Sequence, residues 1–400
     1  MKIAIDARWI FNEISGIGVY TTNLIRILLQ LDRENEYLLL FDDPIRRDAV
    51  CGFLNLLRRN DIANAVLPYS LFSVKNQILL PLFLKKNHID LYHSTNYMIP
   101  LFFKKSRIVV TIHDIIPLKY PHFTPKAKKT KLFGLYRWIM KRVVHISDAV
   151  IVDSLNSKKD IIDYFSCNEK KVYRIYPGID RDFLTKDTNE NTINFKELYS
   201  VKGEMILAVG RQDPYKNIVS LVKAFYKLRQ ETYTNCSLIL VGSDDKRYTD
   251  AIELVKELEI QKNVTFTGYL SKRDLISLYK QSDLLVLPSR YEGFGLPLIE
   301  AFASGLPVIA SNSSSIPEVV GDAGLLVDPD DIDGFTNAMK KIFSDHEFSA
   351  SLIGKGYQRL SYFSWEKAGE ELIDIYKNVA QKRVICDNES LSTLKRKQDV

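Results

Sequence analysis

The fold of this chain is decided by residues 289–311, which read SRYEGFGLPLIEAFASGLPVIAS. An apolar run at 284–287 comes just before this stretch and predicts a buried strand. Gly293 and Gly295 then open a loop, and Pro297 suits the first turn of a helix, where its missing N–H is not needed. A glycine-rich turn that leads into a helix N-terminus presents bare backbone amides and a positive dipole end. The stretch therefore predicts a phosphate-binding loop.

Two glutamates accompany this loop. Glu292 lies before the turn and Glu300 lies inside the helix, so we expect them to reach different parts of a ligand. Dinucleotide fingerprints and Walker loops use the same backbone amides without this pair of carboxylates. The stretch resembles the retaining glycosyltransferases of the GT-B fold, particularly the large family 4, whose signature is two glutamates separated by seven residues, as here.

The resemblance extends over nearly the whole chain, from Met1 to about residue 380. It implies an α/β protein of the GT-B fold, in which two doubly wound, Rossmann-like domains face each other across a cleft. We expect an acceptor-binding domain over 1–185 and a nucleotide-sugar-binding domain over 200–362. A helix over 363–380 would cross back to the first domain. Residues 381–400 are polar and show no periodicity, so we expect them to be disordered.

Hydrophobic patterning alone supports two α/β halves, because short apolar runs alternate with helical patterns throughout. A polar stretch at 186–203 separates the halves and is the best linker candidate. Ligands in such folds bind at the carboxyl ends of the strands. We expect strands at 2–6, 37–41, 89–93, 108–113, 149–153 and 172–176, and then at 205–209, 237–241, 264–267, 284–287 and 307–310.

Two basic residues follow the first strand of the second half. Arg211 comes directly after it and Lys216 shortly afterwards, so both lie in the loop at the carboxyl end of the strand. A departing nucleoside diphosphate builds up negative charge, and fixed basic side chains stabilise it without a metal. The resemblance implies that Arg211 and Lys216 contact the donor diphosphate. The aspartates at 328, 330, 331 and 333 fit turn and N-cap chemistry better than a metal site.

The resemblance also implies the other contacts of the site, residue by residue. Glu292 would act on the transferred sugar through its hydroxyls, Glu300 would hold the ribose, and His113 would lie near the donor sugar. The remaining donor-binding residues are Phe294, Gly295 and Leu296 at the diphosphate, Gly16 and Gly18 at the diphosphate and the acceptor, and Tyr269 and Leu270 near the base.

The glycines before the first helix permit another interpretation. Gly16 and Gly18 can be read as part of a dinucleotide fingerprint, and Asp42 at the end of the second strand suits that interpretation. However, Thr21 takes the place of the third glycine, and the glycines do not follow the first strand directly. A nicotinamide oxidoreductase is therefore the alternative outside sugar chemistry.

Positive charge is concentrated in the first half of the chain, although the net charge is only +6. Between 101 and 145 only Asp114 opposes eleven lysines and arginines. The segment 119–145 mixes these cations with Phe133, Tyr136, Trp138, Ile139 and Val143. We expect it to lie on an anionic membrane surface with its aromatic side inward, or else to be a solvated basic face over a core helix. No nucleic-acid-binding module accompanies it.

The composition indicates an ordinary intracellular globular protein. Four scattered cysteines form neither a disulfide framework nor a zinc motif. The N-terminus lacks the features of a signal peptide, and no apolar run approaches the ~20 residues that span a bilayer. We therefore expect a cytoplasmic protein that is peripheral at the inner face of the cytoplasmic membrane.

The run HDIIPLKYP at 113–121 resembles a bacterial mannosyltransferase subgroup of polysaccharide assembly. We therefore predict a retaining glycosyltransferase that moves a hexose, best mannose from GDP-mannose, onto a lipid-linked saccharide. No residue stands out as a nucleophile, so the family's same-face attack, assisted by the leaving phosphate, is implied. The alternatives are a UDP- or dTDP-sugar donor (glucose, N-acetylglucosamine or rhamnose), a GT-B sugar-nucleotide epimerase, and a catalytically silent nucleotide-sugar-binding partner.

Overall fold

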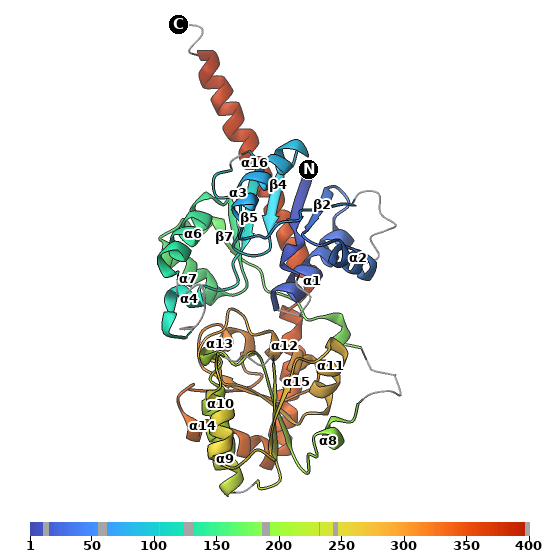
Figure 1. Ribbon diagram of the computed structural model, residues 1–400, viewed down its shortest axis with the longest axis vertical. Helices are drawn as coiled ribbons and strands as arrows, with labels where there is room; N and C mark the ends of the chain where they lie inside the picture. Colours follow the sequence, from blue (N-terminus) through green and yellow to red (C-terminus); the bar gives the residue numbers. More distant parts are fainter. Residues whose placement is uncertain are drawn as a thin grey trace.

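The computed structural model describes residues 1–10, 16–54, 62–103, 105–123, 132–185, 193–231, 233–242 and 247–396, with side chains up to residue 381. The chain forms two α/β halves that stand one above the other along its longest axis (Figure 1). Each half is built on its own parallel sheet. The predicted pair of parallel-sheet domains is confirmed.

The first sheet has seven parallel strands in the order β3-β2-β1-β4-β5-β6-β7. Its central strands are apolar and almost fully buried, as expected for a parallel sheet with both faces covered. The sequence predicted six of these strands and missed β3. The strands are β1 (Lys2–Asp6), β2 (Glu36–Phe41), β3 (Ile62–Val66), β4 (Leu91–Ser94), β5 (Arg107–Thr111), β6 (Ala149–Val152) and β7 (Val172–Arg174).

Helices cover both faces of the first sheet and enclose two separate cores. One face carries α1 (Gly16–Leu31), α2 (Pro44–Phe53) and the start of α16 (Trp365–Arg396). The other face carries α3 (Val74–Lys86), α4 (Ile116–Lys119), α6 (Phe133–Ile146) and α7 (Leu155–Phe165).

The second sheet has six parallel strands in the order β10-β9-β8-β11-β12-β13. They are β8 (Met205–Val209), β9 (Ser237–Val241), β10 (Val264–Gly268), β11 (Leu284–Leu287), β12 (Val308–Ser311) and β13 (Leu325–Val327), of which the sequence missed β13. One face carries α9 (Ile218–Glu231), α10 (Asp250–Glu257) and α14 (Ile332–Ser344), and the other carries α8 (Phe195–Leu198), α11 (Lys272–Gln281), α12 (Leu296–Ala303) and α13 (Ile316–Val320). Helix α15 (His346–Arg359) packs against α12 and α14.

The chain crosses between the two halves twice, and the crossings lie against each other. The backbone N–H of Ile179 donates to the carbonyl of Phe363 over 3.1 Å. A Cβ built on Gly178 would lie 2.7 Å from the carbonyl carbon of Ser364 and closer still to the backbone nitrogen of Trp365. Only glycine therefore fits at this crossing.

Helix α16 returns to the first half and completes its core, as the sequence predicted. It packs along α1, where Gly369 allows close approach to Ile27 and Leu31. The hydroxyl of Tyr376 lies 2.6 Å from Nδ1 of His93 on β4. The helix continues to Arg396 and projects beyond the first half (Figure 1). The prediction of a disordered tail from residue 381 is therefore wrong as far as Arg396, because the helical hydrogen bonding does not end where the apolar periodicity does.

The domain boundaries stay a prediction, but the packing of the cores bears on them. Ile179, Phe183 and Phe195 all belong to the core beside the second sheet. Part of the predicted linker is thus anchored in the second half, and residues 186–192 lie outside the described residues.

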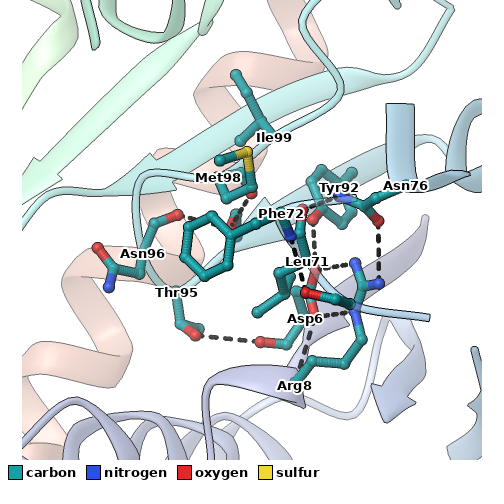
Figure 2. A network of polar contacts seen from close by, with 12 residues as sticks. Asp6, Arg8, Leu71, Phe72, Asn76, Tyr92, Thr95, Asn96, Met98 and Ile99 are labelled. Atoms are coloured by element: carbon teal, nitrogen blue, oxygen red, sulfur yellow. Dashed lines mark hydrogen bonds and ion pairs between the residues drawn. The ribbon is translucent and has the colours of Figure 1, made fainter. Parts of the chain in front are cut away.

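A buried ion pair fixes the end of β1 to the start of α3 (Figure 2). The guanidinium of Arg8 is fully buried and donates to both oxygens of Asp6, over 2.9 and 2.7 Å. Arg8 also donates to the side-chain oxygen of Asn76 on α3 over 2.9 Å. Tyr92 donates to Asp6 over 2.6 Å, and the Thr95 hydroxyl donates to the Asp6 carbonyl over 3.1 Å. This network holds three separate segments at one edge of the sheet.

The close crossing gives a direct test of the architecture. The substitution Gly178→Ala inserts a methyl group where the Trp365 backbone lies, so we expect a loss of about 1–3 kcal/mol in the free energy of unfolding. Gly52→Ala on the exposed side of α2 is the matched control, because a Cβ there meets nothing within 4 Å. Urea unfolding of both variants measures the difference. If the two variants were equally stable, the close contact between Gly178 and the Trp365 backbone would be wrong.

Candidate functional site

The strand orders place the candidate site at the centre of the molecule. In each sheet the order reverses once, between β1 and β4 in the first and between β8 and β11 in the second. Ligands of doubly wound folds bind in the crevice beyond the strand ends at such reversals. The loops after β8 and β11 carry Arg211, Lys216 and Glu292, and the segment after β1 leads into Gly16.

The loop before α12 has the predicted glycine-dependent geometry. Gly295 caps the helix with φ 104°, a left-handed conformation that favours glycine. A Cβ on Gly293 would lie 2.5 Å from the carbonyl oxygen of His113, so the loop touches the first domain directly. Phe294 is 5 % exposed and packs among Tyr176 and Phe363. The side chain of Phe294 thus anchors the loop. In the first turn of α12 Pro297 has no N–H and the Leu298 N–H donates to the Gly295 carbonyl over 3.0 Å, so the amides left to a ligand are those that precede Pro297.

A run of serines at the end of β12 holds this loop and was not among the predicted site residues. Four serine hydroxyls make five hydrogen bonds to the loop backbone, and the Glu292 N–H is the donor in one of them. The signal was the run SNSSS at 311–315, directly after a strand. The bonds join Ser311 to the Ser289 carbonyl, Ser313 to the Arg290 carbonyl, Ser314 to the Glu292 N–H, and Ser315 to the carbonyls of Glu292 and Phe294.

Lys216 and Glu292 form an ion pair. The Lys216 ammonium lies 2.7 and 2.9 Å from the two carboxylate oxygens of Glu292. Both side chains are largely buried, at 14 % and 9 % exposure. Arg211 is 56 % exposed and lies 3.0 Å from a carboxylate oxygen of Asp213. The structure therefore brings together the predicted diphosphate-binding lysine and the predicted sugar-binding glutamate.

Asn217 fixes the position of Lys216. It has a left-handed backbone with φ 57° and ends the short helix at 214–216. Its amide group donates to the carbonyls of Pro288 and Pro329 over 3.1 and 2.6 Å. Asn217 thus ties the loop after β8 to the loops after β11 and β13.

Glu300 projects from α12 and meets Tyr279 of α11. The Tyr279 hydroxyl donates to the carboxylate over 2.8 Å. Burial raises the pKa of Glu300 to about 7, although the hydroxyl of Tyr279 acts in the opposite direction. Nothing in the sequence pattern of α11 marks Tyr279 as the partner of Glu300.

The residues predicted near the base follow a bulge. Gly268 has φ 67° at the end of β10, where the pairing with β9 shifts register. Tyr269 is 49 % exposed. Leu270 packs against the core between the second sheet and helices α11 and α12. Their contact with a base stays a prediction.

The N-termini of two helices converge at the site. Gly16 begins α1, and a Cβ on it would lie 4.0 Å from the side chain of Leu296, which begins α12. Gly18 is buried within the first turn of α1. Residues 11–15, which precede α1, lie outside the described residues. Two positive dipole ends from different domains therefore face one region.

The geometry around His113 assigns it a positive charge. Its Nδ1 lies 2.5 Å from the Asp153 carboxylate, and its Nε2 lies 3.2 Å from the Thr95 carbonyl oxygen. Since both partners accept, each ring nitrogen carries a proton and donates. Burial alone would lower the pKa of His113, but Asp153, followed by Asp114, raises it above its ordinary value. The sequence predicted His113 but not Asp153, which arrives from another strand.

Direct contacts hold the two domains together beside this site. The Ser157 hydroxyl lies 3.1 Å from the His113 carbonyl and 3.2 Å from the Gly293 carbonyl. The Glu318 carboxylate accepts from the first-turn amides of α7 over 2.8 and 3.2 Å, where the helix dipole favours a negative charge. Tyr291 donates to Asp160 across the same interface.

The predicted basic segment 119–145 is only partly described, because residues 124–131 lie outside the described residues. In α6, Tyr136 and Val143 are buried in the core between this helix and the first sheet. Phe133 and Ile139 pack against the same core. Trp138 is 49 % exposed. The expectation that the aromatic side faces a membrane is therefore wrong for Tyr136 and Val143, which the sheet needs as core. No described helix is long and apolar enough to cross a membrane.

The aspartates after β13 have the roles that turn chemistry predicts. Asp331 caps α14 by accepting from the Gly334 N–H over 2.8 Å, and Asp328 accepts from the Asp330 N–H over 2.9 Å. Asp333 pairs with Lys227 over 2.6 Å. Among the described residues, no group of histidine, cysteine and acidic side chains has the arrangement of a metal site.

Together these features suit a ligand that carries both anionic charge and hydroxyl groups. Lys216, Arg211 and two helix N-termini supply positive potential without a metal. Glu292 and Glu300 supply acceptors for hydroxyl groups on either side. The site lies between domains, where a ligand can contact both.

Known families match both halves of the chain. Residues 189–359 match the family described as glycosyl transferases group 1, and residues 14–183 match Glycosyltransferase Family 4. The chain is 28 % identical over 94 % of its length to O-antigen chain mannosyltransferase B of Escherichia coli, and it covers all of that protein. It is 30 % identical over 74 % of its length to O-antigen chain mannosyltransferase RfbU of Salmonella typhimurium, covering 76 % of that protein.

Solved structures of glycosyltransferases share the fold. Sucrose-phosphate synthase of Thermosynechococcus elongatus superposes with a TM-score of 0.73 at 21 % identity, covering 94 % of this chain and 98 % of that one. WaaG, a glycosyltransferase involved in lipopolysaccharide biosynthesis, superposes with a TM-score of 0.70 at 17 % identity, covering 93 % and 99 %. These similarities confirm the predicted GT-B fold.

The pairing of His113 with Asp153 makes a pH-dependent prediction. Asp153→Asn should lower the pKa of His113, because burial then dominates. A raised folded-state pKa stabilises the protein below the unfolded pKa of about 6.5, and this stabilisation is lost as pH rises through the folded value. We expect the variant to lose about 2 kcal/mol at low pH and less at high pH. NMR titration of the His113 ring and urea unfolding measure both effects.

Asp163→Asn is the matched control for that experiment, because Asp163 is exposed on the neighbouring helix α7. It should leave the pKa of His113 unchanged. If the pKa of His113 were the same in Asp153→Asn, Asp153 would not be what keeps the His113 ring protonated.

Proposed function

Because the chain belongs to the group 1, family 4 glycosyltransferases, we propose that it is a retaining mannosyltransferase that uses GDP-mannose. Its acceptor is a lipid-linked saccharide of cell-surface polysaccharide synthesis. The names of the O-antigen mannosyltransferases similar to it support the choice of mannose and of this pathway. The observation that carries the proposal is the buried Lys216–Glu292 pair, whose glutamate lies in the loop that leads into α12.

The donor lies on the second domain. Arg211 and Lys216 contact its diphosphate, and the backbone amides of Phe294, Gly295 and Leu296 add hydrogen bonds. In the structure Glu292 already holds Lys216, so the diphosphate competes with Glu292 for this ammonium. Glu292 then turns to the hydroxyls of mannose.

Glu300 holds the ribose, and its position on α12 supports this role. Glu300 lies about one helical turn beyond Leu296, so it is displaced along α12 from the loop that takes the diphosphate. Tyr279 orients the carboxylate and leaves part of its acceptor capacity unused. Tyr269 and Leu270 lie at the base.

The transfer needs no nucleophile from the protein. The acceptor hydroxyl attacks C1 of mannose on the face that the diphosphate leaves, so the new C–O bond forms as the bond to phosphate breaks. The departing phosphate oxygen takes the hydroxyl proton. Negative charge grows on the diphosphate, and Arg211 and Lys216 stabilise it. The imidazolium of His113 adds positive charge from the first domain, where the acceptor lies.

The protein works at the inner face of the cytoplasmic membrane, where lipid-linked acceptors are built. The segment 119–145 contacts this surface through the exposed part of α6. Trp138 and Leu135 are about half exposed there, beside Arg137 and Lys141. This mixture of aromatic and basic side chains suits an anionic interface.

Calorimetry with GDP, UDP, ADP and dTDP in the presence of a chelator tests the donor. We expect GDP to bind most tightly, because it is the leaving group of the proposed donor. Arg211→Gln should weaken GDP binding about tenfold to a hundredfold, the value of one hydrogen bond to a charged group. Lys256→Gln, an exposed lysine of α10, is the control and should not change it. A preference for UDP or dTDP would overturn the mannosyl donor, and no binding without metal would overturn the cation site.

The raised pKa of Glu300 predicts how GDP affinity varies with pH. The pKa is about 7, and ribose hydroxyls bind the ionised carboxylate, so binding below this pH must release a proton. Affinity should be constant above about pH 7 and should fall by up to tenfold for each unit below it. Glu300→Gln should bind more weakly and remove this dependence. Calorimetry across this pH range measures both, and an identical slope in the variant would exclude Glu300 as its source.

A further inference from the structure

Helix α3 exposes an apolar face that the folded chain leaves uncovered. Val74, Ile78 and Leu82 are 76 %, 56 % and 59 % exposed and follow one another at intervals of four residues. This spacing puts them on one side of the helix, while Leu80 and Leu84 face the core. Large apolar side chains in a row on a helix surface mark a site of interaction.

The exposed face continues across the neighbouring loop to α6. Phe102 is 72 % exposed, and its ring lies 6.5 Å from that of Trp138. Gln77 of α3 bonds the backbone of this loop at Ile99 and Leu101 over 3.1 and 2.8 Å. Arg142 of α6 donates to the Leu101 carbonyl over 3.1 Å. Helix α3, the loop and α6 therefore form one surface on one side of the first sheet.

This surface is held rigidly from beneath. The buried Arg8 binds Asn76 at the start of α3, and Asn76 donates to the Leu71 carbonyl over 2.9 Å (Figure 2). The ring of Phe72 packs edge-on against Trp9 at 5.7 Å. The exposed side chains are thus displayed by an ordered support.

The charge around the surface identifies its occupant. Helices α3 and α6 contain no acidic residue, and Arg137 and Lys141 are exposed on α6. Lys75, Lys85 and Lys86 are exposed on α3 itself. Protein interfaces are depleted in lysine, whereas helices that lie in a membrane surface combine lysine with leucine, phenylalanine and tryptophan. Helix α3 has thirteen residues and is too short to span a bilayer.

We propose that the docking face, formed by α3, the loop at Phe102 and the exposed side of α6, seats the protein on anionic lipid with α3 lying in the plane of the interface. The proposal rests on the proposed function, which puts the acceptor in a membrane, and it adds α3 as the apolar element. The apolar side chains enter the acyl boundary, and the lysines meet the headgroups. The orientation of the first domain on the membrane is thereby fixed.

Vesicle flotation of the full chain tests the docking face. The vesicles are phosphatidylcholine alone or with about a third of phosphatidylglycerol. The double variant Ile78→Gln/Leu82→Gln should bind the anionic vesicles about tenfold or more weakly. Lys85→Gln/Lys86→Gln should lose about fivefold for each charge removed, on anionic vesicles only. Ile45→Gln/Leu198→Gln is the control, because these residues are 79 % and 58 % exposed elsewhere, and it should bind as the unaltered chain does.

Other outcomes overturn the proposal. Unchanged vesicle binding by Ile78→Gln/Leu82→Gln would remove α3 from the interface. A dimer that this variant disperses, without vesicle binding, would assign the face to a second copy of the chain. GDP binding and transfer to an acceptor freed of its lipid report the proposed function separately. They should be unchanged in the variant, so loss of vesicle binding with intact transfer isolates the docking face.

Discussion

The two halves of the molecule depend on one close contact between crossing segments. At Gly178 the chain that leaves the first domain touches the chain that returns at Trp365, and no side chain fits between them. The adjoining bond from Ile179 to Phe363 makes the two crossings a single joint. The loops at the carboxyl ends of the two sheets also touch each other, because Gly293 of the second half lies against the His113 carbonyl of the first. The site therefore needs no dedicated scaffold beyond the fold itself.

The positive charges of the site are already paired with carboxylates of the chain. Lys216 contacts Glu292, Arg211 contacts Asp213, and His113 contacts Asp153. The pairing keeps the largely buried charges of Lys216 and His113 from being isolated, which would be strongly unfavourable. Under the proposed function, the diphosphate would exchange these carboxylates for its own oxygens, and the net free energy of binding would be smaller than the attraction of free cations suggests. The proposed exchange would link the recognition of the diphosphate to the release of Glu292 for the sugar.

Local sequence patterns predicted most of the fold, because the apolar periodicity of a strand or a helix is visible within a few neighbouring residues. Four of the five strands expected in the second domain begin or end at the expected residues, and Arg211 and Lys216 lie in the loop after β8, where the sequence put them. Contacts between distant segments were not predictable. Asp153 and Tyr279 reach His113 and Glu300 only through the packing of separate elements, and neither has a motif around it. The burial of the Tyr136 side chain likewise depends on which side of α6 packs on the sheet.

Helix α16 has a consequence for how the chain folds during its synthesis. The first domain is synthesised first, yet part of the core on one face of its sheet comes from Trp365, Leu372 and Tyr376 at the far end of the chain. That apolar face is uncovered while the ribosome makes the second domain. Domains generally fold in the order in which they are synthesised. Here the order is broken, so the first domain reaches its final form only after the second is complete. The nascent chain is exposed to chaperones for that whole interval.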